Sequence, residues 1–143
     1  MGINNKVKKR VIVIEDDKDI NKLITYNLEN EGFYVESIFD GNKAAKKIQK
    51  QHFDIVILDI MLPGKDGFQI CKIIKDIPSI YKTYIVIISA KCNIQDKLYA
   101  HILGADHYIC KPFNISALIE VIKDLSFKNN EEFRFKNSKN YFT

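Results

Sequence analysis

Five short apolar runs alternate with five stretches of helical periodicity, and this alternation constrains the fold more than any other feature of the sequence. The runs are rich in valine, isoleucine and aromatic residues, which favour β-strands. They are RVIVIE (10–15), FYVES (33–37), DIVILD (54–59), YIVIIS (84–89) and HYIC (107–110). The first, third and fourth are apolar almost throughout, as is typical of strands covered on both faces in a parallel sheet.

The stretches between these runs repeat apolar residues at helical spacing. We expect helices at 17–30, 42–51, 66–76, 92–103 and 113–125. The apolar stripe of the first comprises Ile20, Leu23, Ile24 and Leu28, and that of the fourth comprises Ile94, Leu98, Ile102 and Leu103. Gly32, Pro78 and Gly104 act as stop signals. With right-handed crossovers, this order predicts a (βα)5 α/β fold, a doubly wound parallel five-stranded sheet with helices on both faces.

Length and composition fit one globular domain. The chain has 143 residues, of which 46% are hydrophobic and 28% charged, and its net charge is +4. Lysines are scattered among acids, which favours a solvated surface over direct contact with nucleic acid. No apolar stretch is long enough to cross a membrane, and no secretory signal begins the chain. We therefore predict a cytoplasmic protein.

The cysteines give little indication of a function. Cys71, Cys92 and Cys110 are odd in number and lack the CxxC spacing of metal sites and redox motifs. We therefore predict three reduced thiols, with neither a disulfide nor a bound metal.

Acids, a hydroxyl and a lysine follow the expected strands where ligands bind in open α/β sheets. Glu15 and Asp16 follow the first strand, Asp59 ends the third, Ser89 ends the fourth and Lys111 follows the fifth. Because the carboxyl ends of parallel strands lie on one side, we expect these five side chains to share a shallow cleft.

Each of these residues also has an ordinary structural explanation. Asp16 or Asp17 could cap the helix that follows, Lys111 could be a surface lysine, and Ser89 could be a hydroxyl at a strand end. Their coincidence at one end of a predicted sheet is what favours a functional site.

Clustered carboxylates need a cation, because their repulsion would otherwise force one of them to keep its proton. Hard oxygen ligands without histidine or cysteine favour Mg²⁺ (or Mn²⁺) over zinc. The ammonium of Lys111 suits a phosphoryl oxygen, and the Ser89 hydroxyl could bind another. The cluster therefore predicts phosphoryl chemistry, with Asp59 as the nucleophile that forms an aspartyl phosphate.

Four segments in this order resemble the receiver domains of two-component response regulators, the CheY-like superfamily. They are VIVIEDD, FDIVILDIMLPGKDGF, IVIISAK and GADHYICKPF, and the resemblance runs from about residue 10 to 125. It implies a flavodoxin-like sheet with strand order 2-1-3-4-5. It also implies that Asp59 accepts a phosphoryl group from a phosphohistidine on a sensor histidine kinase or phosphotransfer protein.

The resemblance also implies a ligand set for the metal and the phosphoryl group. Asp16 and Asp59 would hold Mg²⁺ or Mn²⁺ through their side chains, with Glu15 helping through water. Met61 would contribute its backbone carbonyl. Ser89 and Lys111 would bind the phosphoryl group.

The implied switch begins when Ser89 moves toward the new phosphoryl group and draws in the loop after the fourth strand. Tyr108 then turns inward and changes the face formed by the fourth helix, fifth strand and fifth helix. A half-buried Tyr108 that does not move remains the alternative. Structural roles are implied for Gly67 or the turn at Pro63, which lets the preceding loop bend, and for Pro112, which follows a cis peptide bond.

Three other functions can be compared with this one. A receiver-like interaction module that works without phosphorylation would usually have lost an acid or the lysine. A flavin binder would need a Ser/Thr/Gly-rich phosphate loop where EDDKDI is acidic. A phosphatase would need an acid at the position of Met61. We therefore predict a signalling domain that phosphorylates itself and slowly loses the phosphoryl group, and no enzyme with turnover.

We expect an N-terminal extension at 1–9, the receiver domain at 10–125, and a C-terminal tail or the start of a linker at 126–143. An extended last helix or a docking segment anchored by Phe133 and Phe135 remains an alternative for the tail. The tail is too short for an output domain, so we expect either a stand-alone receiver or a piece of a longer chain. A homodimer also remains open, although the last helix, NISALIEVIKDL, offers only one basic residue.

Overall fold

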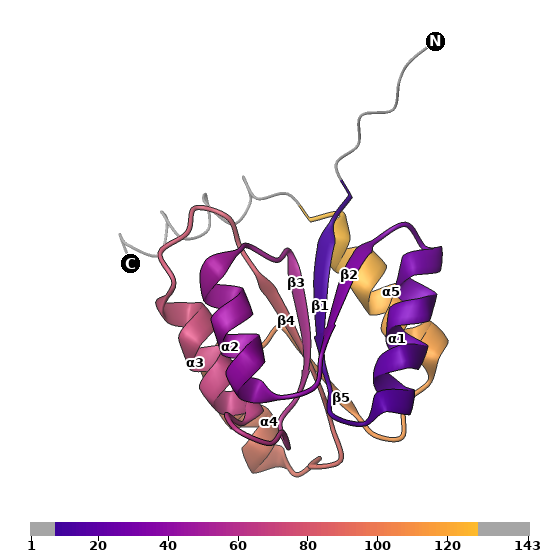
Figure 1. The fold of residues 1–143 in the computed structure, drawn as a ribbon. Coiled ribbons are helices and arrows are strands. Elements are labelled where there is room, and N and C mark those ends of the chain that lie inside the picture. The colour runs from indigo at the N-terminus through magenta and orange to yellow at the C-terminus, as the bar shows by residue number, and fades with distance from the viewer. Residues whose placement is uncertain (1–7, 129–143) are drawn as a thin grey trace.

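The computed structural model describes residues 8–128, which form a five-stranded sheet between two layers of helices (Figure 1). The strands are β1 (Arg10–Ile14), β2 (Tyr34–Ile38), β3 (Ile55–Asp59), β4 (Tyr84–Ser89) and β5 (His107–Cys110). The helices are α1 (Lys18–Asn30), α2 (Gly41–Lys50), α3 (Gly67–Asp76), α4 (Ile94–Ile102) and α5 (Ile115–Ser126). All neighbouring strands are parallel and their order is β2-β1-β3-β4-β5. The predicted α/β fold and strand order are therefore confirmed.

Apolar side chains cover both faces of the sheet. Helices α2, α3 and α4 pack on one face, and α1 and α5 pack on the other (Figure 1). Successive residues of a strand point to opposite faces. In β1, Ile12 and Ile14 join the first layer, whereas Val11 and Val13 join the second. This double burial explains why the central strands have almost continuous apolar sequences.

A polar side chain caps the start of every helix in the described part of the chain. The caps are Asp17, Asp40, Asp66, Asn93 and Asn114, and each accepts at least one backbone N–H from the first turn. In α1 the cap is Asp17, which accepts the N–H groups of Asp19 and Ile20 at 3.0 and 3.1 Å. Of the two acids that could have capped this helix, Asp17 is therefore the cap. Asp16, which follows β1, does not cap α1.

Three of the four residues in the apolar stripe predicted for α4 do not face the core. Ile94, Leu98 and Ile102 are 72%, 56% and 68% exposed, whereas Ala100 and Leu103 are buried. Residues four positions apart form one line along a helix, so a single rotation of α4 places the whole line in solvent. The sequence pattern predicts the helix but cannot say which of its apolar positions contacts the sheet.

The predicted terminal segments lie largely outside the described residues. These exclude residues 1–7 and 129–143, so the extension at 1–9 and most of the tail at 126–143, with Phe133 and Phe135, are not described. Within residues 8–128, none of the helices has the length and apolarity that crossing a bilayer requires.

Candidate functional site

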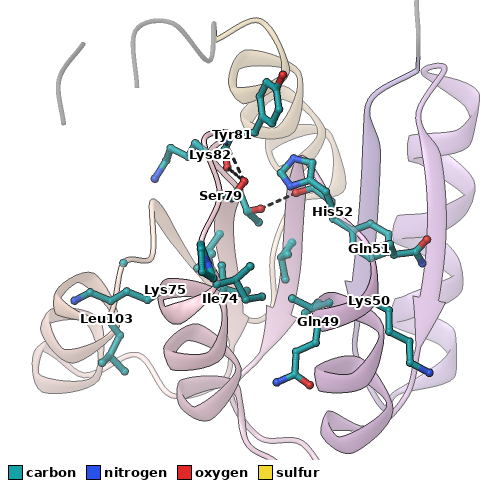
Figure 2. Close-up of a pocket in the computed structure, with 18 residues that line it drawn as sticks. Gln49, Lys50, Gln51, His52, Ile74, Lys75, Ser79, Tyr81, Lys82 and Leu103 are labelled. Carbon is teal, nitrogen blue, oxygen red and sulfur yellow. Dashed lines mark hydrogen bonds between the residues drawn. The ribbon is translucent and has the colours of Figure 1, made fainter. Parts of the chain in front are cut away.

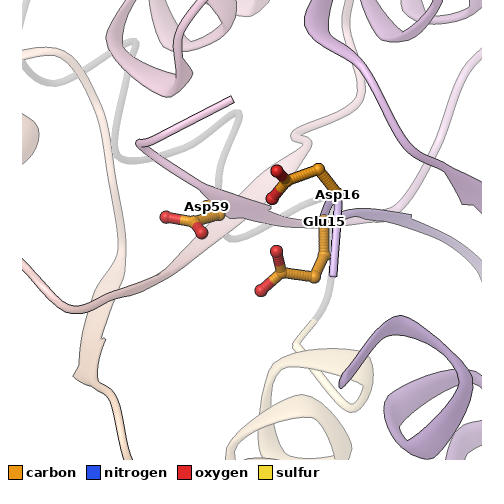
Figure 3. A group of neighbouring side chains, drawn as sticks. All are labelled: Glu15, Asp16 and Asp59. Carbon is orange, nitrogen blue, oxygen red and sulfur yellow. The ribbon is translucent and has the colours of Figure 1, made fainter. Parts of the chain in front are cut away.

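Three carboxylates meet at the carboxyl end of the sheet, where β1 and β3 are neighbours (Figure 3). Glu15 and Asp16 follow β1, and Asp59 is the last residue of β3. One carboxylate oxygen of each lies within 4.8 Å of the other two. Glu15 and Asp59 are buried and Asp16 is exposed, so the cluster is accessible from solvent on the side of Asp16.

Lys111 supplies the positive charge of this cluster. Its Nζ lies 2.8 Å from Asp59 Oδ2 and also donates to Glu15 Oε1. Burial alone would lower the pKa of Lys111, but the hydrogen bonds to the two carboxylates outweigh the burial and raise it. The backbone N–H of Lys111 donates to the Ser89 carbonyl at 2.8 Å, and the peptide bond between Lys111 and Pro112 is cis.

Glu15 is a carboxylate of this cluster whose charge is only partly compensated. Its side chain is fully buried, and this burial raises its pKa, although hydrogen bonds from Lys111 and from the Asp17 N–H oppose the shift. One ammonium cannot balance three carboxylates, so the cluster favours a further cation or a retained proton. Its donors are all carboxylate oxygens, which fit Mg²⁺ or Mn²⁺ better than zinc.

Asp59 is held at both carboxylate oxygens. The Met61 N–H donates to Oδ1 at 3.0 Å, while Lys111 donates to Oδ2. These contacts explain how a carboxylate can end a strand whose other residues are all buried and apolar. They also hold the Asp59 carboxylate in one orientation.

The loop after β3 turns sharply so that α3 begins next to Asp59. Gly64 has φ +79°, which favours glycine, and the preceding Pro63 carbonyl accepts the Gly41 N–H at 2.9 Å. Gly67 is needed for a different reason, because a Cβ there would come within 2.7 Å of the Asp59 carbonyl oxygen. The turn therefore needs Gly64, and the close packing of α3 on β3 needs Gly67.

Ser89 and Tyr108 both contact the loop after β4. The buried Ser89 hydroxyl accepts the Lys91 N–H at 3.1 Å, and the half-buried Tyr108 donates its hydroxyl to the Lys91 carbonyl. Burial raises the pKa of Tyr108, while a hydrogen bond with Ser89 opposes the shift. The main chain of Lys91 thus connects the two side chains that the resemblance implies as the switch.

The prediction of three reduced thiols is wrong for two of them. Cys92 and Cys110 form a disulfide with their Cα atoms 5.8 Å apart, whereas Cys71 is free and buried. The two cysteines are 18 positions apart in the sequence. However, β4 and β5 are neighbours, and Ser89 pairs with Cys110 in the strand register. The sheet therefore brings together a pair that a search for CxxC spacing cannot find.

Asn21 is a positioning residue that the sequence reasoning missed. It is buried on α1, and its Nδ2 lies 3.3, 3.0 and 3.2 Å from the carbonyl oxygens of Val13, Glu15 and Ile38. These contacts hold the end of β1 that carries the acids. The sequence signal that could have identified Asn21 is its place on the same helical face as the buried Ile24. Leu23, which we expected in the apolar stripe, is instead 46% exposed.

A groove of about 630 Å³ lies at the opposite, amino end of the sheet (Figure 2). It is lined by the ends of α2 and α3 and by the segment that leads into β4, including His52, Ile74, Tyr81 and Lys82. Among residues 8–128, no acidic side chain lines it. Because this groove lacks convergent carboxylates, the carboxyl end of the sheet is the candidate functional site in spite of the groove's size.

The family model of the response regulator receiver domain matches residues 11–123. This match includes all five polar residues predicted to meet at the strand ends: Glu15, Asp16, Asp59, Ser89 and Lys111.

Solved structures of similar fold come from several organisms. A CheY-like receiver domain protein from Methanospirillum hungatei JF-1 is 27% identical with a TM-score of 0.78, over 88% of this chain and 98% of that chain. The receiver domain of Francisella response regulator 1452 is 31% identical with a TM-score of 0.76, over 82% and 96%. The response regulator TrrA of Thermotoga maritima, in complex with Mg(2+)-BeF, is 31% identical with a TM-score of 0.71, over 82% and 98%.

Proposed function

The chain belongs to the response regulator receiver domain family, and from this premise we propose that it is a phosphorylation-activated receiver of a two-component system. Asp59 accepts the phosphoryl group from a phosphohistidine of a sensor histidine kinase or phosphotransfer protein. The observation that carries the proposal is the convergence of Glu15, Asp16 and Asp59 within 4.8 Å, with Lys111 Nζ 2.8 Å from Asp59.

In the proposed transfer, a carboxylate oxygen of Asp59 attacks the phosphorus atom. A new O–P bond forms, the P–N bond of the phosphohistidine breaks, and its electron pair goes to the imidazole nitrogen. Lys111 balances negative charge on the phosphoryl oxygens, and Ser89 donates a hydrogen bond to one of them. The arrangement of Asp59 between Met61 and Lys111 supports this step, since transfer depends chiefly on positioning and charge.

Glu15, Asp16, Asp59 and the Met61 carbonyl would hold Mg²⁺ or Mn²⁺, with Glu15 acting through water. Such an ion supplies positive charge that offsets the repulsion between the carboxylates and the incoming phosphoryl group. The need of this cluster for a cation supports the assignment, as does the similar TrrA protein, which was solved with Mg(2+)-BeF.

Receiver domains are signalling domains, and we propose no catalytic turnover for this one beyond its own phosphorylation and slow loss of the phosphoryl group. A second carboxylate two residues after Asp59 would assist hydrolysis, but that position holds Met61. A cytoplasmic location fits a domain that receives its phosphoryl group from a histidine kinase.

The output is proposed to depend on the face formed by α4, β5 and α5. Ser89 and Tyr108 both contact Lys91, so movement of Ser89 toward a phosphoryl group would be transmitted to Tyr108. The exposed line of Ile94, Leu98 and Ile102 on α4 offers this face apolar area for an output domain or protein. A second copy of the chain could use the same area to form a homodimer.

The experiment is incubation with acetyl phosphate and Mg²⁺, followed by intact mass measurement. We expect the protein to gain one phosphoryl mass, and we expect Asp59→Asn to gain none. Asp54→Asn is the matched control, because Asp54 is a partly buried carboxylate at the other end of the same strand and accepts the Arg10 N–H. It should gain the phosphoryl mass as the natural protein does.

Two results would contradict the proposal. Labelling that persists in Asp59→Asn would place the phosphoryl group elsewhere. No labelling with acetyl phosphate or phosphoramidate would instead favour an interaction module that works without phosphorylation.

A further inference from the structure

We propose that Cys92 and Cys110 are a reversible thiol–disulfide modification site, and that their oxidation makes phosphorylation of Asp59 more favourable. The second part rests on the proposed function. The oxidant is of the low-molecular-weight disulfide class, for which oxidised glutathione is the probe.

The disulfide joins the two segments on which the switch depends. Cys92 lies in the loop between β4 and α4, next to Lys91, and Cys110 is the last residue of β5, next to Lys111. The same loop is fixed at Lys91, which donates its N–H to Ser89 and accepts the hydroxyl of Tyr108. A covalent bond from Cys92 to Cys110 therefore holds this loop close to the end of β5.

Cys92 and Cys110 are accessible to a small thiol or disulfide, whereas the third cysteine, Cys71, is not. Both Cys92 and Cys110 are half-buried, so each has surface that a small disulfide can reach. Cys71 is fully buried, and burial raises the pKa of its thiol to about 12, which leaves little reactive thiolate. With Cα atoms 5.8 Å apart, Cys92 and Cys110 fall within the ordinary range for a disulfide.

The proposed oxidation proceeds by two thiol–disulfide exchanges. The thiolate of one cysteine attacks a sulfur of glutathione disulfide, which forms a mixed disulfide and releases one glutathione thiolate. The second thiolate of the pair then attacks the protein sulfur of that mixed disulfide and displaces the second glutathione. The two cysteines lose two electrons and two protons, and glutathione disulfide is reduced to two thiols.

Reduction would release Cys92 without leaving its sulfur isolated. Its Sγ lies 3.4 Å from the Ser89 carbonyl oxygen, which can accept a hydrogen bond from the thiol. That contact is weaker than a covalent link to Cys110, so the loop should be more mobile in the dithiol form. Under reducing conditions this dithiol form should predominate, because glutathione and thioredoxin keep most thiols of the cytoplasm reduced.

Oxidation and phosphorylation should favour each other, because both stabilise the loop close to β5. In the proposed switch, the phosphoryl group draws in Ser89 and its loop, and the disulfide holds that loop through Cys92. Energetic coupling between two sites is reciprocal. We therefore expect the oxidised protein to bind beryllium fluoride and Mg²⁺ more tightly by about 5-fold or more.

The first measurement counts thiols. The full chain is equilibrated in glutathione buffers of increasing oxidised fraction, denatured, alkylated and weighed. Of its three cysteines, all should be alkylated in the reducing buffer and one, Cys71, in the oxidising buffer. Cys71→Ser should still lose two alkylated cysteines on oxidation, whereas Cys92→Ser and Cys110→Ser should form no internal disulfide. Three alkylated cysteines in every buffer would overturn the proposal.

The second measurement compares the oxidised and reduced forms of the natural chain and of Cys71→Ser. Amide hydrogen exchange at residues 90–93 should be slower in the oxidised form, and beryllium fluoride should bind more tightly to it. Equal exchange and equal binding in the two forms would overturn the coupling. If neither form takes up a phosphoryl group or beryllium fluoride, the proposed function fails, while the thiol count and the exchange rates still decide the redox site.

Discussion

The two ends of the sheet both hold carboxylates, but they compensate them differently. At the amino end each carboxylate has its own partners: Asp54 accepts the Arg10 N–H at 2.8 Å, and Asp106 pairs with Lys82 at 3.1 Å. At the carboxyl end, the ammonium of Lys111 pairs with two of the three clustered carboxylates, those of Glu15 and Asp59. The negative charges of Asp54 and Asp106 are therefore compensated by their own partners. At the carboxyl end the carboxylates carry excess negative charge, which favours the binding of a cation.

The pKa shifts of two acids reflect this difference. Burial would raise the pKa of Asp54, but hydrogen bonds from His52 and the Arg10 N–H, together with nearby positive charge, outweigh it and lower the pKa. For Glu15, burial dominates and the pKa is raised despite the contact with Lys111. A buried acid is therefore not by itself a sign of a functional site, and the useful sign is an acid whose charge remains uncompensated.

The largest expected effect is on the rate of phosphorylation, and it should distinguish Lys111 at the carboxyl end of the sheet from Lys82 at the amino end. We expect Lys111→Met to slow phosphorylation of Asp59 by about 100-fold or more, because a charge that stabilises the transferred group is lost. Lys82→Met, which removes the partner of Asp106, should leave the rate unchanged. Mass measurement over time with acetyl phosphate gives both rates. Equal rates in the two variants would mean that Lys111 has no role in transfer.

Metal binding should distinguish the acids of the two ends. Mg²⁺ at 100 times its dissociation constant should stabilise the protein against urea by about 2.7 kcal/mol. Asp16→Asn should lose most of this gain, since Asp16 belongs to the carboxylate cluster, while Asp106→Asn should keep it. Urea denaturation with and without Mg²⁺ measures the gain. A gain that survives in Asp16→Asn would place the ion elsewhere.

The lowered pKa of Asp54 predicts a stability difference that depends on pH. A group whose pKa is lower in the folded protein stabilises it above the unfolded value, here 3.8, and this contribution disappears as the pH falls through the folded value. We expect Asp54→Asn to cost about 1–3 kcal/mol at pH 7. Urea denaturation of both proteins should show the difference shrinking below about pH 4. A difference that stays constant to the lowest pH would mean that the ionised carboxylate is not its source.

The smallest expected effect concerns two hydroxyls at opposite ends of β4. Thr83, before the strand, donates to the Phe53 carbonyl at 2.8 Å, and Ser89, at its end, accepts the Lys91 N–H. Thr83→Val should cost about 1 kcal/mol of stability without changing phosphorylation. Ser89→Ala should change stability by a similar amount or less, but it should slow phosphorylation several-fold. If both variants were phosphorylated at the natural rate, Ser89 would have no part in transfer.

Much of the fold could be read from the sequence because its signals are local. The apolar runs gave all five strands to within one residue at their ends, and each helix was found to within two residues. The five polar residues at the strand ends could also be found, because parallel strands place their carboxyl ends together. The exposed face of α4 could not be found, since an apolar line on a helix can face the sheet, solvent or a partner.

The sequence by itself determined which groups are available: the order of strands and helices, and the acids, hydroxyl and lysine that follow the strands. Only the tertiary structure decided which of them are partners. It brought Cys92 to Cys110 across neighbouring strands, assigned the helix cap to Asp17, and buried Asn21 against the end of β1. The reason is that hydrophobic periodicity specifies the type and extent of an element, whereas a contact between distant residues depends on how packed elements align.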